Sequence, residues 1–214
     1  MSREDIEHTK YKMNKLDNLA RIYLGRHCKV RWNLEGRLIG TTDLPLCEEG
    51  LIEAKSNLSQ IENLGIERII CSSLKRAHQT AQIYAEYLGV PLHVCPGLRE
   101  IDHGIWNGQK TDELLDDKNS DFKIWFDDPT SIPIPEGTEP IPMAQKRIVE
   151  TIKKIALRYP GETLLVIMHK HIRSILRCTL LGIGLKHFRE NIDESVIPFE
   201  IPREQLLKLW EIEL

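Results

Sequence analysis

The chain has 214 residues, a length that suits one α/β domain with an ample core. Its formal net charge of -3 gives no overall attraction to nucleic acid or to an anionic membrane, so local basic groups must provide any anion binding. The five cysteines form no C-x-x-C pair, which favours reduced thiols. No apolar run is long enough to span a membrane, and residues 1–20 lack the apolar core of a signal peptide, so we expect a cytoplasmic protein.

Residues 1–20 form a predicted charged N-terminal extension, and residues 21–214 form a predicted single domain. The domain starts with a short buried strand that contains Ile22 and Leu24, and Arg26 and His27 stand side by side where this strand ends. In open α/β sheets the crevice at the carboxyl ends of the strands is the usual ligand site. An imidazole there can act as a nucleophile and a guanidinium can hold a phosphate, although an Arg-His pair taken alone can equally arise by chance.

Helical and strand patterns then alternate along the chain. The strand at 163–168 (TLLVIM) is continuously apolar, as expected inside a parallel sheet. Pro198 and Pro202 favour an edge hairpin in the tail at 191–214. The order of elements predicts a three-layer α/β/α fold with a mostly parallel mixed sheet and helices on both faces. The predicted helices are 46–64, 74–88, 141–159 and 172–181, and further strands are predicted at 67–71, 92–94 and 163–168.

The run from Gly25 to Gly50, GRHCKVRWNLEGRLIGTTDLPLCEEG, resembles the opening of the histidine phosphatase family, the phosphoglycerate-mutase-like proteins. That opening reads R-H-G-E-T-x-W-N, then G-R-x-x-G, then D-x-P-L-x-x-x-G. Two positions depart from it, because Cys28 replaces the family glycine and Lys29 replaces its glutamate. The residues that match at fixed spacing are Arg26, His27, Trp32, Asn33, Gly36, Arg37, Gly40, Asp43, Pro45, Leu46 and Gly50.

Two further stretches resemble motifs of the same family. SSLKRAHQTA is similar to S-S-x-x-R-A-x-Q-T-A and places Arg76 in the first turn of a helix, where its side chain and the helix N-terminus can both face an anion. LREIDHGIWNG is similar to L-R-E-x-x-F-G-x-W-E-G, and Glu100 matches the carboxylate that acts there as proton donor. Burial and the negative charge of a phosphate would keep such a carboxyl protonated, the state that a leaving alcohol needs. Outside the motifs, both residues would be read as solvated side chains.

The strand predicted at 163–168 is followed directly by His169. The family reads S-H-G-G-x-I-R at this point and the chain reads MHKHIR, so that Lys170 and His171 stand where small residues are usual and one position is missing. We place the second histidine of the catalytic site at His169, because it directly ends the strand, and His171 is the alternative. A His-x-His pair can also bind a metal, but metals need more ligands and none is evident, so we predict neither a metal nor a cofactor.

The polar and aromatic stretch at about 109–140 corresponds to the variable helical lid of the family. Family mutases tend to read E-R-H-Y-G around the proton donor and carry longer insertions, so the segment around Glu100 favours the phosphatase branch. The resemblance therefore implies a metal-independent phosphatase that hydrolyses a small phosphorylated metabolite. Two alternatives stay open, a phosphoglycerate-mutase-type phosphotransferase and a binding protein that keeps the fold without turnover.

The resemblance also implies a role for each candidate residue. His27 would attack phosphorus and form a phosphohistidine, and Glu100 would protonate the departing alkoxide and then help water to release phosphate. The substrate-binding residues, which would surround the transferring group and stabilise its charge, are Arg26, Asn33, Arg76 and His169.

Three replacements add cationic side chains where the family has neutral or acidic ones, at Lys29, Lys170 and His171. They suggest a substrate with more negative charge than a simple monophosphate, and the alternative is that the lysines point to solvent. Cys28 is either a tolerated small residue or an oxidant-sensitive neighbour of the nucleophile. We expect no nucleic-acid or membrane partner, and a homodimer is left open.

Overall fold

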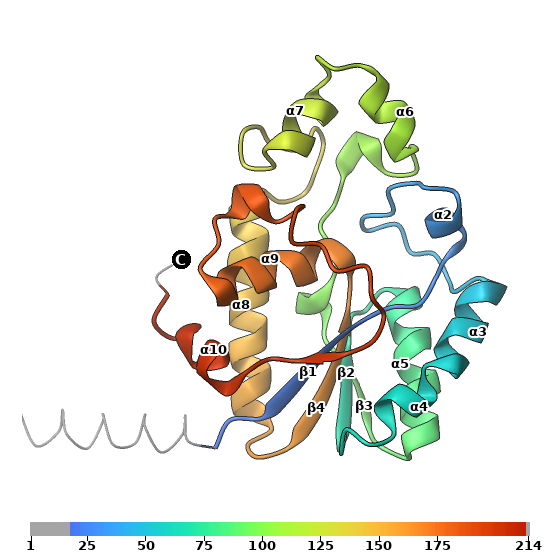
Figure 1. Cartoon of the computed structure of the whole chain (residues 1–214), viewed down its shortest axis with the longest axis vertical. Coiled ribbons are helices and arrows are strands. Elements are labelled where there is room, and N and C mark those ends of the chain that lie inside the picture. Colours follow the sequence, from blue (N-terminus) through green and yellow to red (C-terminus); the bar gives the residue numbers. More distant parts are fainter. Residues whose placement is uncertain (1–17, 213–214) are drawn as a thin grey trace, which may run out of the picture.

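The computed structural model describes residues 18–212, and a five-stranded sheet lies at its centre (Figure 1). Three of the four strand pairings in this sheet are parallel, and the fourth, at one edge, is antiparallel. The predicted mostly parallel mixed sheet is therefore confirmed. In spatial order the strands are β3 (Leu92–Val94), β2 (Arg68–Cys71), β4 (Thr163–Met168), β1 (Arg21–Arg26) and β5 (Phe199–Glu200).

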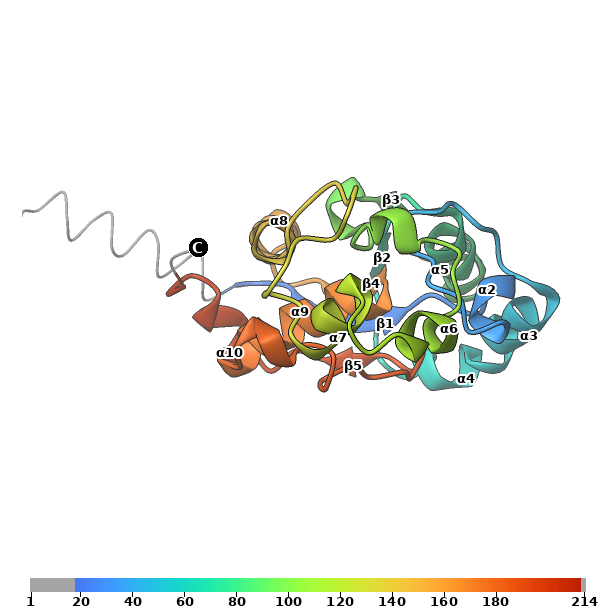
Figure 2. The ribbon, with the colours of Figure 1, turned by 90° about the horizontal axis from the view of Figure 1, so that it is seen from above.

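Helices cover both faces of this sheet, as Figure 2 shows from above. One face carries α3 (Glu48–Ser56), α4 (Leu58–Ile61) and α5 (Lys75–Leu88), and the other carries α8 (Ile141–Arg158), α9 (Lys170–Leu181) and α10 (Arg203–Lys208). Successive strand residues point to opposite faces, so Ile22 and Leu24 join one apolar core while Tyr23 joins the other. The predicted three-layer architecture is confirmed.

Several predicted element boundaries differ from the structure. The helix expected at 46–64 is two helices, α3 and α4, which are separated at Asn57. The helix expected from residue 172 begins at Lys170, directly after His169. The edge hairpin predicted in the tail is wrong, because only Phe199–Glu200 pairs with β1 and the chain then forms α10. Leu206 and Leu209 are both buried, at a spacing of three residues that suits a helix face rather than a strand.

The N-terminal part of the predicted extension, residues 1–17, lies outside the described residues. Leu19 and Ala20 were assigned to that extension, but both are buried in the core. The main-chain N–H of Ala20 donates to the carbonyl of Ala156 in α8. The packed part of the chain therefore begins before residue 21.

The stretch predicted as a lid forms two short helices above the sheet, α6 (Thr111–Asp116) and α7 (Asp121–Asp127) (Figure 1). Phe122 and Trp125 of α7 are buried and pack against Trp106 of the 3-10 turn Gly104–Trp106. The short helix α2 (Arg31–Leu34) lies at the same end of the molecule. Within residues 18–212, no helix is long and apolar enough to cross a membrane.

Candidate active site

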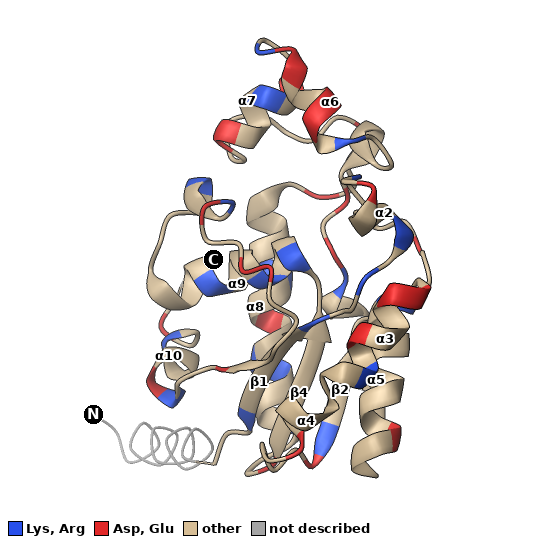
Figure 3. Cartoon of the chain, turned by 45° about the vertical axis from the view of Figure 1, so that its right-hand side comes forward, with Lys and Arg blue, Asp and Glu red and all other residues tan. Residues whose placement is uncertain are grey.

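The candidate site lies at the carboxyl ends of three neighbouring parallel strands. His27 follows β1, Ser72 follows β2 and His169 follows β4. Because β4 lies between β1 and β2 in parallel register, these three ends meet at one edge of the sheet. The ring centroids of His27 and His169 are 5.1 Å apart. Figure 3 shows Lys and Arg residues at this end of the sheet and along α9.

His27 is buried, and one hydrogen bond fixes its tautomer. Its Nδ1 lies 2.8 Å from the carbonyl oxygen of Cys28, and because a carbonyl can only accept, Nδ1 carries the hydrogen. Nε2 is left with its lone pair and accepts a hydrogen bond from Nε of Arg76 at 3.2 Å. Burial lowers the pKa of His27 well below its ordinary value of 6.5, and the charges of Arg76 and Arg26 lower it further. The imidazole is therefore neutral at pH 7, and Nε2 becomes available as a nucleophile when the N–H of Arg76 turns from its lone pair to an anion.

Arg76 is almost completely buried in the first turn of α5, and carbonyl groups of one loop orient it. Its Nη1 donates to the carbonyl of Thr42 at 2.8 Å and its Nη2 to the carbonyl of Gly40 at 2.7 Å. Burial lowers the pKa of Arg76 to about 10, so the guanidinium keeps its charge at neutral pH. Gly40 has a φ of +51°, and a Cβ atom there would lie 2.2 Å from Oδ1 of Asn107. This position of the family motif therefore needs glycine to place the arginine.

His169 packs against the ring of His27 and has no exposed surface. Its Nε2 is 2.7 Å from the hydroxyl oxygen of Ser72, while its Nδ1 is buried without a hydrogen-bond partner among the described residues. Burial lowers the pKa of His169 well below its ordinary value, and the charges of Arg76 and His27 act in the same direction. The structure thus brings His169 next to His27 and, within the part of the chain that it describes, leaves Nδ1 of His169 free to bind a ligand.

Glu100 is buried and fixed by three main-chain N–H groups. Its Oε1 accepts from Ile101 at 3.0 Å and from Ile172 at 2.9 Å, and its Oε2 accepts from His171 at 3.0 Å. Two of these donors belong to the first turn of α9, whose N–H groups have no partner within the helix. The carboxylate therefore joins the loop after β3 to the start of α9 and lies in the same recess as His27.

Arg26 and Asn33 reach the cavity from β1 and α2. Nη1 of Arg26 donates to both the carboxylate and the main-chain carbonyl of Glu194, the latter at 3.0 Å, while its Nε is buried without a partner. Oδ1 of Asn33 accepts from the main-chain N–H of Val30 at 3.0 Å. The amide nitrogen of Asn33 is therefore the group that can donate to a ligand.

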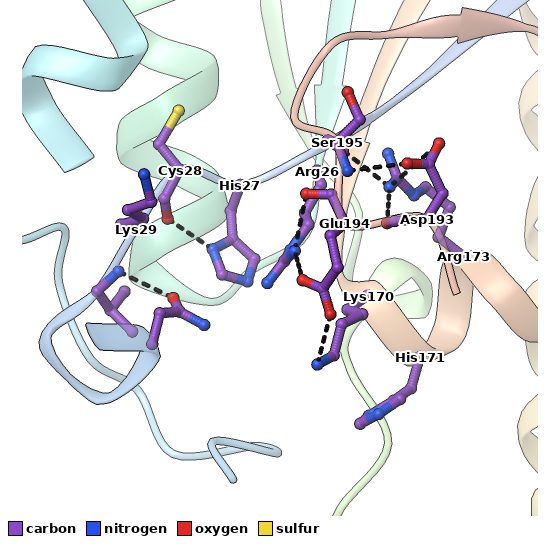
Figure 4. A network of polar contacts seen from close by, with 12 residues as sticks. Arg26, His27, Cys28, Lys29, Lys170, His171, Arg173, Asp193, Glu194 and Ser195 are labelled. Atoms are coloured by element: carbon purple, nitrogen blue, oxygen red, sulfur yellow. Dashed lines mark hydrogen bonds and ion pairs between the residues drawn. The ribbon is translucent and has the colours of Figure 1, made fainter. Parts of the chain in front are cut away.

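These side chains surround one hollow, part of which is seen in Figure 4. An outer cavity of about 420 Å³ is lined by Arg26, His27, Asn33 and Lys170 among others. A small inner recess of about 40 Å³ shares these four residues and is closed by Arg76, Glu100, His103 and His171. All the predicted site residues thus lie around the hollow or, for His169, directly behind it.

His103 was not predicted as a site residue. It is 1% exposed, lines the inner recess and has no hydrogen-bond partner at either ring nitrogen among the described residues. Its ring packs on the ring of His171 at 4.9 Å, and Nδ1 of His171, which lies 3.8 Å from Oε2 of Glu100, also has no hydrogen-bond partner among the described residues. The available signal was a histidine where the family motif has phenylalanine. Across residues 18–212, no three His, Cys, Asp or Glu side chains are grouped to hold a metal ion.

The lysines that suggested a more negative substrate both have carboxylate partners. Nζ of Lys29 lies 3.0 Å from Oε1 of Glu53, and Nζ of Lys170 lies 3.1 Å from Oε1 of Glu194. Cys28 points into the core beneath the site, where its Sγ is 3.7 Å from the hydroxyl of Tyr84. Burial raises the pKa of Cys28 to about 11, which favours the interpretation as a tolerated small residue over an oxidant-sensitive one.

The chain is similar to known proteins over most of its length. The family model described as histidine phosphatase superfamily (branch 1) matches residues 22–200. Phosphoserine phosphatase 1 of Hydrogenobacter thermophilus is 29% identical over 195 residues, which cover 89% of this chain and 92% of that protein. Probable phosphoglycerate mutase GpmB of Enterobacter sp. is 30% identical over 166 residues, covering 77% of this chain and 76% of the relative. Among solved structures, YhfR of Bacillus stearothermophilus has a TM-score of 0.72 and 30% identity, over 79% of this chain and 83% of that one.

Proposed function

Because the chain belongs to the histidine phosphatase superfamily, we propose that it hydrolyses a small phosphorylated metabolite through a phosphohistidine on His27. The observation that carries this proposal is the state of the His27 ring, whose Nδ1–H is held by the Cys28 carbonyl so that Nε2 faces Arg76. The class of enzyme predicted from the sequence, a phosphoric monoester hydrolase, is confirmed by the family together with its phosphatase relatives. The residue roles below are part of the proposal.

The reaction has two steps that share one covalent intermediate. In the first step the lone pair of Nε2 of His27 forms a bond to phosphorus while the bond between phosphorus and the leaving oxygen breaks. That oxygen takes a proton from Oε2 of Glu100, which accepts one N–H where Oε1 accepts two, so Oε2 is the oxygen that would carry the proton. In the second step Glu100 takes a proton from water, and the water oxygen bonds to phosphorus while the P–Nε2 bond breaks. The Cys28 carbonyl, which accepts from Nδ1–H, stabilises the positive charge that the ring carries in the intermediate.

Fixed donors and cations would bind the three equatorial oxygens of the transferring group. Arg76 is held in place by loop carbonyls, and its Nε already faces the attacking nitrogen. His169 would donate from its unpartnered Nδ1, which requires its Nε2 to accept the hydroxyl hydrogen of Ser72. Arg26 and the amide nitrogen of Asn33 would complete the shell from the outer side.

The leaving group would lie in the outer cavity, whose volume of about 420 Å³ suits a small metabolite. The unpartnered nitrogens of His103 and His171 supply hydrogen bonds to a polar leaving group where it meets the inner recess. Because Lys29 and Lys170 are each paired with a glutamate, they do not support a substrate that carries a second negative charge. One relative is named for phosphoserine, a small phosphorylated metabolite whose leaving group is a zwitterion without net charge. A cytoplasmic location and a homodimer stay predictions.

The roles of His27 and Glu100 can be tested with two types of substrate. His27→Ala should abolish both turnover and an acid-labile phosphoenzyme that rapid quenching detects in the unchanged protein. Glu100→Gln should slow an alkyl phosphate, whose alkoxide needs a proton, far more than an aryl phosphate, whose leaving group departs without one. Equal losses on both substrates, or turnover that survives in His27→Ala, would contradict the proposal.

A phosphoglycerate-mutase-type transfer is the second candidate, because one 30% identical relative is named a probable phosphoglycerate mutase. Both reactions would use the same phosphohistidine and differ in its acceptor, which is water or a hydroxyl of a metabolite. Incubation with a phosphorylated donor and labelled phosphoglycerate, followed by separation of products, distinguishes the two. We expect inorganic phosphate as the main product. Absence of any turnover with intact His27 would favour the binding-protein alternative.

A further inference from the structure

The guanidinium of Arg26, which the proposed function assigns to phosphate, is already paired with the carboxylate of Glu194. The Arg26–Glu194 contact is double, because Nη1 of Arg26 donates to the side chain and to the main-chain carbonyl of Glu194. The second carboxylate oxygen of Glu194 lies 3.1 Å from Nζ of Lys170. Figure 4 shows Glu194 between these two cations, reached from the segment that precedes β5. One side chain therefore neutralises two cations of the cavity in this state.

This contact lies at the rim of the cavity rather than in its interior. The side chain of Glu194 is 65% exposed, whereas that of Arg26 is only 10% exposed. Burial acts to raise the pKa of Glu194, but the charges of Arg26 and Lys170 outweigh it and the pKa is lowered, so the side chain is ionised at neutral pH. An exposed carboxylate with one charge holds a guanidinium less firmly than a phosphate dianion that also contacts Arg76.

The other cations of the outer cavity wall are not available to compensate. Lys29 is paired with Glu53 at 3.0 Å, and Nε of Arg37 lies 2.7 Å from Glu35. When phosphate takes Arg26, Glu194 keeps only Lys170 and faces the space where the leaving group must lie. A second anionic group on the substrate would meet this carboxylate directly.

We propose that Glu194 is a specificity-determining residue: its carboxylate competes with phosphate for Arg26 and, once displaced, disfavours leaving groups that carry a second negative charge. The inference rests on the proposed phosphate site and extends it to the class of leaving group, which is neutral or carries an ammonium group. The competition raises the concentration of phosphate needed to fill the empty site. The displaced carboxylate then acts on substrate choice through like-charge repulsion.

Binding of inorganic phosphate tests the competition without any turnover. Glu194→Gln removes the charge and keeps the shape, so calorimetry at neutral pH should show phosphate bound about fivefold more tightly, which is roughly 1 kcal/mol. Glu190→Gln is the matched control, because Glu190 lies on the same segment, has a 70% exposed side chain and pairs with His187 instead. An affinity in Glu194→Gln that equals or falls below that of the control would overturn the proposal.

Three phosphate esters with two-carbon leaving groups test the specificity. O-phosphoethanolamine carries an ammonium group, 2-hydroxyethyl phosphate a hydroxyl, and 2-phosphoglycolate a carboxylate. Glu194→Gln should raise kcat/KM for 2-phosphoglycolate relative to O-phosphoethanolamine by about fivefold or more, with the hydroxyl ester between them. An unchanged order and unchanged ratios among the three esters would refute the role in specificity.

The two experiments also separate this inference from the proposed function. If the protein turns over none of these esters and no aryl phosphate, but Glu194→Gln still binds phosphate more tightly, the phosphatase assignment fails and the competition for Arg26 stands. Glu194→Ala is measured beside Glu194→Gln. In both variants Arg26 keeps its hydrogen bond to the main-chain carbonyl of residue 194, so only the side chain of this residue differs between the compared proteins. Thermal unfolding of each variant shows that the compared proteins are folded.

Discussion

Replacing His103 by phenylalanine should change how the stability of the fold depends on pH. The imidazole of His103 is 1% exposed, and neither ring nitrogen has a partner among the described residues. Burial, followed by the charge of Arg189, lowers the pKa of His103 from its ordinary value of 6.5 to about 3. The ring already packs edge-on against Trp125 and His171, so an aromatic hydrocarbon ring keeps these contacts.

The size of the effect follows from proton linkage. Below pH 6.5 the unfolded chain binds a proton at His103, whereas the folded protein does not do so until the pH nears 3. A lowered pKa in the folded state therefore means that stability is complete above pH 6.5 and is lost as the pH falls. The loss is about 1.4 kcal/mol per pH unit, which gives about 2 kcal/mol at pH 5. His103→Phe lacks this loss and should gain that much over the unchanged protein between pH 7.5 and pH 5.

Urea unfolding at pH 7.5, 6 and 5 measures the free energy of unfolding directly. A second variant, His103→Asn, separates titration from packing, because asparagine is polar but does not titrate near these pH values. As the pH falls, both variants should lose less free energy of unfolding than the unchanged protein. Only His103→Phe also removes the unsatisfied ring nitrogens, so its free energy of unfolding should be higher by about 1–3 kcal/mol at every pH. If the three proteins lose stability in parallel, His103 does not remain neutral in the fold and the reasoning is refuted.

Three further predictions address the nucleophile and its supports. Arg76→Gln should lower kcat by about 10²- to 10³-fold, as expected when a preorganised donor to the transferring group is lost, and a loss below tenfold in steady-state kinetics would contradict its role. Iodoacetamide should leave Cys28 unmodified and activity intact in the folded protein, and peptide mapping that finds rapid labelling of Cys28 would oppose its burial. Gly50→Ala should destabilise the protein, since its Cβ would lie 2.0 Å from the carbonyl of Lys29, whereas Gly184→Ala, with nothing within 4 Å, should be neutral; chemical denaturation compares them.

The fold could be predicted because the sequence pattern and the sheet agree. The continuously apolar strand at 163–168 became β4, which is bordered by parallel strands on both sides. Four stretches of the sequence then supplied side chains at the end of β1, at the start of α5, after β3 and at the end of β4, and the parallel register brings these positions to one edge of the sheet. Parallel strands end at the same edge of the sheet even when they are far apart in the sequence. Residues that directly follow these strands could therefore be predicted to lie in one site.

The tail could not be predicted in the same way. Over so short a stretch its apolar residues are compatible with either a strand or a helix. In the structure this stretch forms α10, and Leu206 and Leu209 are both buried. Glu194 belongs to no motif, and its partner Arg26 is 168 positions away in the sequence. Only folding brings this carboxylate to the cavity and to Lys170. Nothing in the sequence therefore indicated that Lys170 pairs with Glu194 or that Lys29 pairs with Glu53.

Cys28 and Lys29 differ from the residues that the family has at these positions, but the main-chain contacts that hold His27 are kept. The Lys29 carbonyl accepts from the N–H of Cys47, at the start of α3, and Gly50 of the same helix packs against Lys29 so closely that no side chain fits. The loop after His27 is thus held by its backbone, whose Cys28 carbonyl sets the tautomer of the nucleophile. The replaced side chains point elsewhere, that of Cys28 into the core and that of Lys29 to Glu53. A family glycine and a family glutamate can therefore be lost here while the geometry around His27 that the proposed reaction requires is kept.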